Sequence, residues 1–360
     1  MTGDRARAHA VNARPRDAGG RVSSVSRRRL LRGVGTLGVA LAAGCGPGPL
    51  TVATPTPRLR RIGLLIQSGT SGSAELFRRG LGGLGYVEGR DFEFHERDAQ
   101  GVPERLPALA SELVETPVDV IVTIGNAPAA LAAKAATSTI PIVFGSTGNV
   151  VRQGLVSNLV RPGGNVTGVT SLGRVHKQLE LLKEAVPGLV RVAHLGDAKA
   201  PDLADISRDA LEDCRTLGLE CLPNVINPGS PAELEAALQA IERARPDGLF
   251  VWITVSLISL NGGAGFDRVL AFAIERRLPQ LFLNLDGARR GGLIGMAESR
   301  EAGYRIVARQ VDRILKGANP GDLPVEVNTG FDVALNRSMA LKIGLTFPQS
   351  VLLQATEMIP

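Results

Sequence analysis

The chain has 360 residues, 44% of them hydrophobic and 4% aromatic, and its 41 Lys and Arg residues outnumber its 35 Asp and Glu residues. Residues 1–44 hold nine of the basic and two of the acidic residues, so the remainder has 32 basic and 33 acidic residues and a formal net charge of −1. The basic excess therefore belongs to the front of the chain and does not indicate a nucleic-acid-binding surface.

The front of the chain predicts an export signal. Its uncharged stretch, Gly33 to Gly44, follows a cluster of arginines and is shorter than the roughly 20 apolar residues of a membrane-spanning helix. SRRRLLR, from Ser26 to Arg32, resembles the twin-arginine export motif, with Leu30 where Phe is usual. LAAGC, from Leu41 to Cys45, resembles a bacterial lipobox, in which the cysteine becomes the lipidated first residue of the mature chain.

We therefore expect residues 1–44 to be an export signal and Cys45 to be lipidated; a non-lipidated export signal or a short buried helix is the alternative. Residues 45–57 contain four prolines among small residues, which predicts an extended tether between the lipid and a folded body. On this interpretation the protein is extracytoplasmic, in the periplasm or at the cell surface, and its lipid anchors it to the membrane.

From Arg60 onward, apolar strands alternate with amphipathic helices. This pattern is typical of a parallel sheet that is covered by helices on both faces. The predicted strands of the first half are 62–67, 91–97, 118–124 and 140–144, and the predicted helices are 73–84, 103–115 and 127–137.

The second half repeats the first at an offset of about 130 residues. VRVAHL, from Val190 to Leu195, corresponds to the strand that begins near Arg61, and PDGLF, from Pro246 to Phe250, corresponds to VDVI at Val118. A weak repeat of this length predicts two doubly wound α/β lobes rather than one large sheet. Because ligands of such sheets lie at the carboxyl ends of the strands, a cleft between the lobes is the predicted binding site.

Several stretches together resemble the substrate-binding proteins of ABC transporters, in the family that includes tryptophan- and phenylalanine-binding lipoproteins. The most specific is RPGGNVTG at 161–168, and others are GYVEG at 85–89, LELLKEAVPG at 179–188 and ILKG at 314–317. The resemblance covers about residues 58–360. It implies the type I periplasmic binding fold, with two Rossmann-like lobes joined by three crossovers, which we place at 165–171, 291–298 and 325–333. We expect lobe 1 at 58–168 plus about 294–320, and lobe 2 at 169–293 plus about 321–360.

Three loops that follow predicted strands of lobe 1 carry candidate ligand-binding residues. These are Gln67 and Ser68, then Asn126 and Ala127, then Ser146, Thr147 and Asn149. Free N–H groups at the helix start after Asn126 would suit a carboxylate, although Asn126 is equally a plain helix N-cap. Many members of the family carry Asp-Pro after the third of these strands, where this chain has Asn149 and Val150. That departure puts a contact to a ligand ammonium in doubt or moves it elsewhere.

Lobe 2 contributes the candidates Asp197, Thr254 and Asp286, each near the end of a predicted strand. Asp197 either pairs with a ligand ammonium or caps the next helix. Trp252, the only tryptophan, is expected in the core rather than against a ligand. Only 13 residues of the whole chain are aromatic, which disfavours a sugar and favours a small polar solute, amino-acid-like or another carboxylate.

The motifs of cofactor-binding and catalytic proteins do not fit this chain. GLGGLG, from Gly80 to Gly85, matches G-x-G-x-x-G but lies at the end of a predicted helix, so no cofactor is expected. The histidines lack metal-ligand spacing and no nucleophile motif is present, so we expect neither a metal site nor an enzyme. Cys214 and Cys221 are expected to be two thiols, with a disulfide as the alternative.

The sequence therefore predicts a solute-binding lipoprotein that delivers a small molecule to an ABC permease and its ATPase. We expect a monomer that binds no nucleic acid. A ligand-sensing subunit of a membrane signalling protein is the first alternative, and an exported α/β enzyme is the second. A cytoplasmic effector-binding repressor is disfavoured, because it would need a helix-turn-helix where this chain has an export signal.

Overall fold

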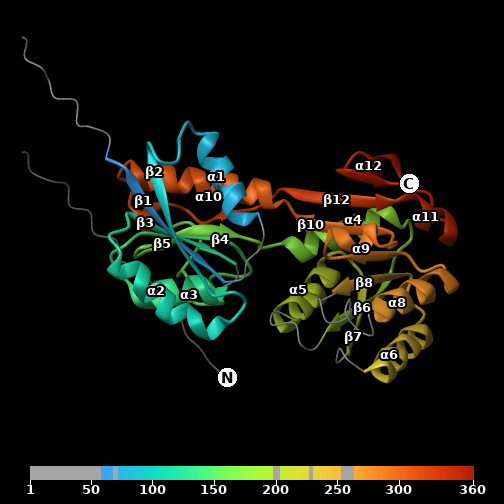
Figure 1. Cartoon of the computed structure of the whole chain (residues 1–360). Coiled ribbons are helices and arrows are strands. Elements are labelled where there is room, and N and C mark those ends of the chain that lie inside the picture. Colours follow the sequence, from blue (N-terminus) through green and yellow to red (C-terminus); the bar gives the residue numbers. More distant parts are fainter. Residues whose placement is uncertain (1–57, 68–71, 126, 198–202, 227–229, 253–262) are drawn as a thin grey trace, which may run out of the picture. The chain divides into compact units, whose positions relative to one another are not determined.

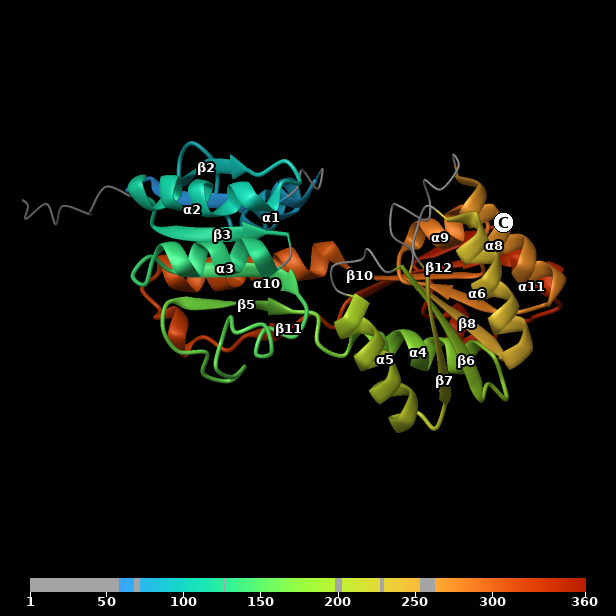
Figure 2. The same cartoon turned by 90° about the horizontal axis from the view of Figure 1, so that it is seen from below.

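The computed structural model describes residues 58–67, 72–125, 127–197, 203–226, 230–252 and 263–360. They form two α/β lobes, each built on one sheet (Figures 1 and 2). The predicted export signal, Cys45 and the tether lie outside these described residues. Within them, no helix has the length and apolar character that crossing a membrane requires.

The sheet of lobe 1 has six strands in the order β11-β5-β4-β3-β1-β2, and all of its pairings are parallel. Its strands are β1 (Arg60–Ile66), β2 (Phe92–Asp98), β3 (Val120–Ile124), β4 (Ile142–Thr147), β5 (Val166–Thr170) and β11 (Glu326–Val327).

Helices cover both faces of this sheet (Figure 1). They are α1 (Ser73–Gly82), α2 (Leu106–Glu115), α3 (Ala127–Ala136) and α10 (Arg300–Leu315), with 3-10 turns η1 (Pro103–Arg105) and η3 (Pro320–Asp322). Neighbouring residues of one strand enter different cores: Leu64 packs with α1 and α10, and Leu65 packs with α2 and α3. Because side chains alternate along a strand, a continuous apolar run is what a sheet buried on both faces requires.

The sheet of lobe 2 has seven strands in the order β13-β12-β10-β9-β8-β6-β7, parallel except where β12 runs against β10. Its strands are β6 (Arg191–Asp197), β7 (Glu220–Ile226), β8 (Gly248–Trp252), β9 (Gln280–Phe282), β10 (Ile294–Glu298), β12 (Phe331–Asn336) and β13 (Glu357–Ile359).

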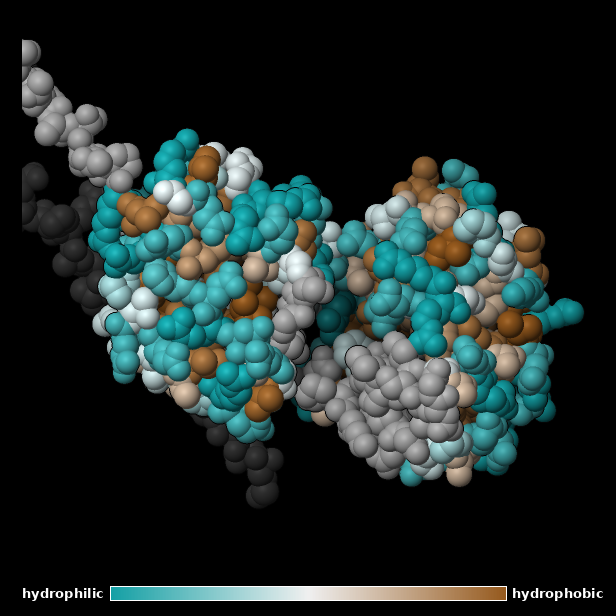
Figure 3. Space-filling model, in the orientation of Figure 1, coloured by the Kyte–Doolittle hydropathy of each residue, from teal (hydrophilic) through white to brown (hydrophobic). Residues whose placement is uncertain are grey.

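The helices of lobe 2 contribute to two apolar cores on their sheet. These helices are α4 (Arg174–Ala185), α5 (Leu203–Thr216), α6 (Pro231–Ala244), α8 (Ala264–Glu275), α9 (Leu285–Arg289), α11 (Arg337–Ile343) and α12 (Gln349–Leu352). One core joins α4, α5 and α11 to the sheet, and the other joins α6 and α8 to it. Outside the cores, hydrophilic residues cover most of the face in Figure 3, and apolar residues are scattered over both lobes.

The two sheets repeat one topology. Lobe 1 contains the order β2-β1-β3-β4-β5 and lobe 2 contains the corresponding order β7-β6-β8-β9-β10. The registers match as well, since Ile62 pairs with Val120 in lobe 1 and Val192 pairs with Gly248 in lobe 2. The prediction of two doubly wound lobes is confirmed.

The chain crosses between the lobes three times, but two crossings lie a few residues beyond the predicted lobe boundaries. β10 pairs with β9 and β12, so residues 294–298 belong to lobe 2 and the return to lobe 1 comes with α10. β11 pairs with β5, so the chain leaves lobe 1 only after Val327. Strand pairing decides these boundaries.

Two local predictions differ from the structure. The strand that was predicted to end near Asp286 ends at Phe282, because the Asn284 side chain accepts a hydrogen bond from Gly287 N and starts α9. The expectation of two thiols is wrong, since Cys214 and Cys221 form a disulfide with their Cα atoms 5.9 Å apart. A tight turn after α5, in which Leu219 N donates to Cys214 O, folds β7 back along the helix and brings the two cysteines together.

Candidate functional site

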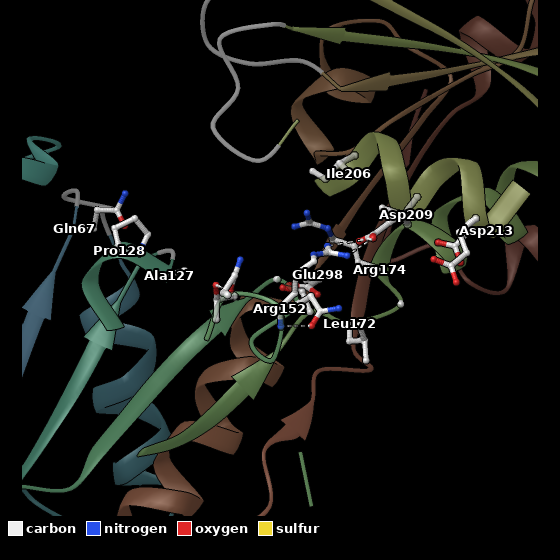
Figure 4. A pocket seen from close by; sticks show the side chains of 18 residues that line it. Gln67, Ala127, Pro128, Arg152, Leu172, Arg174, Ile206, Asp209, Asp213 and Glu298 are labelled. Atoms are coloured by element: carbon white, nitrogen blue, oxygen red, sulfur yellow. Dashed lines mark hydrogen bonds and ion pairs between the residues drawn. The ribbon is translucent and has the colours of Figure 1, made fainter. Parts of the chain in front are cut away.

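A pocket of about 560 Å³ is lined by residues of both lobes (Figure 4). Lobe 1 supplies strand ends, the start of α3 and the loop after β4, and lobe 2 supplies the start of α4, one face of α5 and the end of β10. The lining residues are Gln67, Ala127, Pro128, Thr147, Gly148, Asn149, Arg152, Gln153, Ser171, Leu172, Gly173, Arg174, Val175, Ile206, Asp209, Glu212, Asp213 and Glu298.

The first wall from lobe 1 is formed where β1 and β3 end side by side. Gln67 follows β1, and its backbone N–H donates to Ile124 O at 2.9 Å. Gly125 has φ +125°, and a Cβ there would lie 2.7 Å from the Gln67 Cβ. Glycine is therefore needed at this position, both for its backbone conformation and for the room that it leaves to Gln67.

The loop after β4 is held by its own hydrogen bonds. Thr147 O accepts from Ser171 N at 2.7 Å, and Gly148 O accepts from the Thr170 hydroxyl at 2.7 Å. The Asn149 side-chain oxygen accepts from Arg152 N at 3.1 Å, which closes a turn. Asn149 thus lines the pocket and also shapes the loop that carries Arg152.

The wall from α5 is acidic. Asp209, Glu212 and Asp213 are spaced i, i+3 and i+4, which places them on one face of the helix. Burial raises the pKa of the Asp213 carboxyl, and His176, whose Nδ1 lies 3.2 Å from Asp213 Oδ1, opposes that shift. Three carboxyl groups of α5 thus share one wall of the pocket.

Two arginines of the pocket have different surroundings. Arg152 comes from lobe 1, and its guanidinium lies 3.3 Å from Asp209 Oδ1 in lobe 2, so this ion pair joins the lobes. Arg174 begins α4, and its guanidinium carbon lies 5.4 Å from the centre of the Trp252 ring. Trp252 is half-buried and packs against the core of lobe 2, as expected for a structural tryptophan.

The lining of the pocket is rich in charged and polar side chains. Four carboxylates and two arginines are present, and the remaining polar groups are amides and hydroxyls. Among the described residues that line the pocket there is no His, Cys or Lys. Charged and neutral polar groups around a pocket of this size suit a small polar molecule.

The structure brings four of the residues predicted from sequence into this pocket: Gln67, Ala127, Thr147 and Asn149. Ser146 lies in β4 and Asp197 at the end of β6. Ser68, Asn126 and Thr254 lie outside the described residues. Asp286 is not among the lining residues; it lies in the first turn of α9, exposed, and its carboxylate pairs with Arg289 at 3.2 Å.

The residues that sequence reasoning missed lie on helices rather than at strand ends. Arg174 follows the first crossover by a few residues, and the acidic face of α5 has the i, i+3, i+4 spacing that marks a shared surface. That spacing was a usable signal, but charges on one face of a helix are most often simply solvated. Only the packing of α5 beside the pocket makes them informative.

Comparison with known proteins assigns the chain to a family. The sequence pattern of the ABC transporter substrate binding protein family matches residues 56–359. The chain belongs to this family. Substrate-binding proteins of ABC transporters are extracytoplasmic, and the family is one of solute binding rather than catalysis.

Individual relatives of this substrate-binding chain are distant. A tyrosine-binding protein of Clostridioides difficile (strain R20291) is 25% identical over 314 residues, covering 84% of this chain and 88% of the relative. An ABC domain from Streptococcus pneumonia, solved in complex with L-Trp, is 23% identical with a TM-score of 0.65, covering 84% and 100% of the two chains. A ligand-free, open substrate-binding protein from Clostridium difficile is 22% identical with a TM-score of 0.71, covering 84% and 99%. The two structures show the type I periplasmic binding fold.

Proposed function

We propose that the chain is an extracytoplasmic lipoprotein that binds a small polar solute, amino-acid-like or another carboxylate, between its lobes and delivers it to an ABC permease. The observation that carries this proposal is the composition of the pocket: both lobes line it, and they meet through the Arg152–Asp209 pair. A solute that contacts both walls favours the arrangement in which the lobes are together, so its binding shifts the population of the chain.

The relatives support an amino-acid-like solute. One is named for tyrosine, and another was solved with L-Trp. The pocket offers charged groups of both signs, which a zwitterion can use at its two ends. Gln67, Ala127, Thr147 and Asn149 are proposed as contacts from lobe 1, and Ser68, Asn126, Ser146, Asp197 and Thr254 are kept as further proposed contacts near the strand ends.

A thermal-shift screen tests the binding function. The purified chain is heated with amino acids, small carboxylates, purines, oligopeptides and sugars, one at a time. A solute at about 100 times its Kd adds roughly 2.7 kcal/mol to the free energy of unfolding, which raises the melting temperature visibly. The solute must be recovered chemically unchanged, since turnover would favour the alternative of an exported enzyme.

Two variants of one helix locate the binding. Ala127→Leu adds bulk inside the pocket, whereas Ala135→Leu makes the same change at an exposed position of α3. The shift should disappear in the first variant and persist in the second. A shift that survives Ala127→Leu unchanged would place the solute elsewhere, and the absence of any shift across the panel would contradict the proposal.

Anchoring and delivery need separate experiments. In a bacterium that performs lipidation, the chain should fractionate with membranes, and Cys45→Ala should release it. Replacing the predicted twin arginines, Arg27 and Arg28, by lysine should retain the chain in the cytoplasm. Uptake of the identified solute should fall in cells that lack the chain; normal uptake with a lost signalling response would favour the sensory alternative.

A further inference from the structure

Arg174 is the cation of the pocket that has no acceptor within the described part of the chain. The guanidinium of Arg152 forms an ion pair with Asp209, as described above. The Arg174 side chain forms no hydrogen bond or ion pair with any described residue, and its Nε is fully buried without a partner. A buried donor that loses its water and gains no acceptor costs about 1–3 kcal/mol, and more for a charged group, so a native structure normally supplies one.

Trp252 keeps this guanidinium in place. The ring supports the guanidinium carbon from 5.4 Å, a distance at which a cation is attracted to the face of an indole. The Trp252 Nε1 is also buried without a hydrogen-bond partner among the described residues. Among the described residues, two buried donors without an acceptor therefore lie close together, and one of them belongs to a residue that lines the pocket.

The start of α4 also favours an anion at this place in the pocket. Leu172, Gly173 and Arg174 all line the pocket, and Gly173 as N-cap offers no side-chain oxygen to the first turn. The positive end of the helix dipole thus faces the space beside the guanidinium, and it favours an anion there. The acidic face of α5, whose Asp213 lies 3.2 Å from His176 of α4, lines the same pocket and favours a cation.

We propose that Arg174, supported by Trp252, binds the carboxylate of the solute and so selects solutes that carry one. The solute then lies with its anionic end at the start of α4 and its cationic end toward Asp209 and Glu212. This inference rests on the proposed function, because it names the residue that sets solute class in the same pocket. It also accounts for the departure from the family after β4, where this chain has Asn149 in place of an acidic residue. The carboxylates that face an ammonium come from α5 of lobe 2 instead.

The experiment compares each acid with the amine that lacks only its carboxylate. The probes are L-tyrosine with tyramine and L-lysine with cadaverine, titrated calorimetrically into the wild-type chain, Arg174→Gln and Arg215→Gln. Arg215 is an exposed residue of the same lobe outside the pocket, so its variant carries the same change of net charge. The melting temperature of each variant without solute reports whether it is folded.

Arg174→Gln should weaken binding of the acid about 10- to 100-fold, the range expected when a charged hydrogen bond is lost, and should leave any binding of the amine within about twofold. Arg215→Gln should change neither. Equal weakening of acid and amine by Arg174→Gln would mean a structural role and would overturn the inference. So would a wild-type chain that binds the amines as tightly as the acids, although the binding function would then stand. A wild-type chain that binds none of the four probes and nothing in the wider panel would contradict the proposed function itself.

Discussion

Where lobe 1 ends its central strand with Ile124, lobe 2 ends the corresponding strand with Trp252. Two residues earlier along these strands, the buried pair of Leu64 and Val122 in lobe 1 corresponds to His194 and Phe250 in lobe 2. At these three positions lobe 1 has aliphatic side chains, whereas lobe 2 has two aromatic residues and a titratable histidine.

The two lobes also line the pocket with different kinds of side chain. Lobe 1 lines it mainly with neutral groups, whereas lobe 2 supplies all four carboxylates and Arg174. Two lobes with the same strand order therefore form different walls. The wall from lobe 1 is mainly neutral and can hydrogen-bond many small polar molecules, and the wall from lobe 2 is charged and discriminates among them. The disulfide of the described chain also lies in lobe 2.

The largest expected difference between the lobes concerns their central strands. Phe250→Ala should lower the free energy of unfolding by about 3–5 kcal/mol, because it leaves a cavity at a fully buried site. Val122→Ala, at the matching position of lobe 1, removes two methyl groups and should cost roughly 2 kcal/mol. Urea unfolding measures both, with the exposed Leu341→Ala as a control that changes little. Equal costs for Phe250→Ala and Leu341→Ala would contradict the assigned core.

Mild acid should weaken lobe 2 through His194. Burial lowers the pKa of His194 to about 4, below the 6.5 of an unfolded chain. The unfolded state then binds more protons between these values, so this contribution is fully present above pH 6.5 and is lost as the pH falls toward 4. The free energy of unfolding should fall by up to about 3 kcal/mol, because one pKa unit corresponds to about 1.4 kcal/mol.

The free energy of unfolding measured at intervals from pH 7.5 to 4.5 tests this contribution. The variant His194→Leu, which copies the Leu64 of lobe 1, should have a flatter profile over that range. Identical slopes for the variant and the wild type would exclude His194 as the cause.

Reduction of the disulfide should have a smaller effect, confined to lobe 2. Closing the short loop between Cys214 and Cys221 restricts the unfolded chain, and its loss should cost about 2 kcal/mol. A reducing agent should lower the melting temperature of the wild type and leave that of the double variant Cys214→Ala, Cys221→Ala unchanged. Sensitivity of the double variant to the reducing agent would point to another target.

The ion pair between the lobes should have the smallest effect on stability. The side chains of Arg152 and Asp209 keep about a third of their exposure, so water and salt screen the attraction. A double-mutant cycle of Arg152→Gln and Asp209→Asn should give a coupling energy below about 1 kcal/mol that decreases with added salt. A salt-independent coupling above about 2 kcal/mol would show a bridge much better shielded than these exposures indicate.

The fold was largely predictable from sequence, and the pocket was only half predictable. Gln67, Ala127, Thr147 and Asn149 could be placed because parallel strands end at one edge of a sheet, so the residues that follow them gather there. Arg174 and the acidic residues of α5 could not be placed, since nothing in a helix sequence tells which exposed face meets another part of the chain. Asp286 was misplaced because an N-cap at Asn284 ended the strand early.

The sequence by itself determined the two doubly wound lobes, because alternation of buried strands and amphipathic helices is a local pattern and the chain repeats it. Only the tertiary structure decided which charges share the pocket, which cysteines pair and where the chain changes lobes. These depend on contacts between residues far apart in sequence, as when Arg152 meets Asp209, or on the turn that carries β7 back along α5. Periodicity carries no information about such contacts.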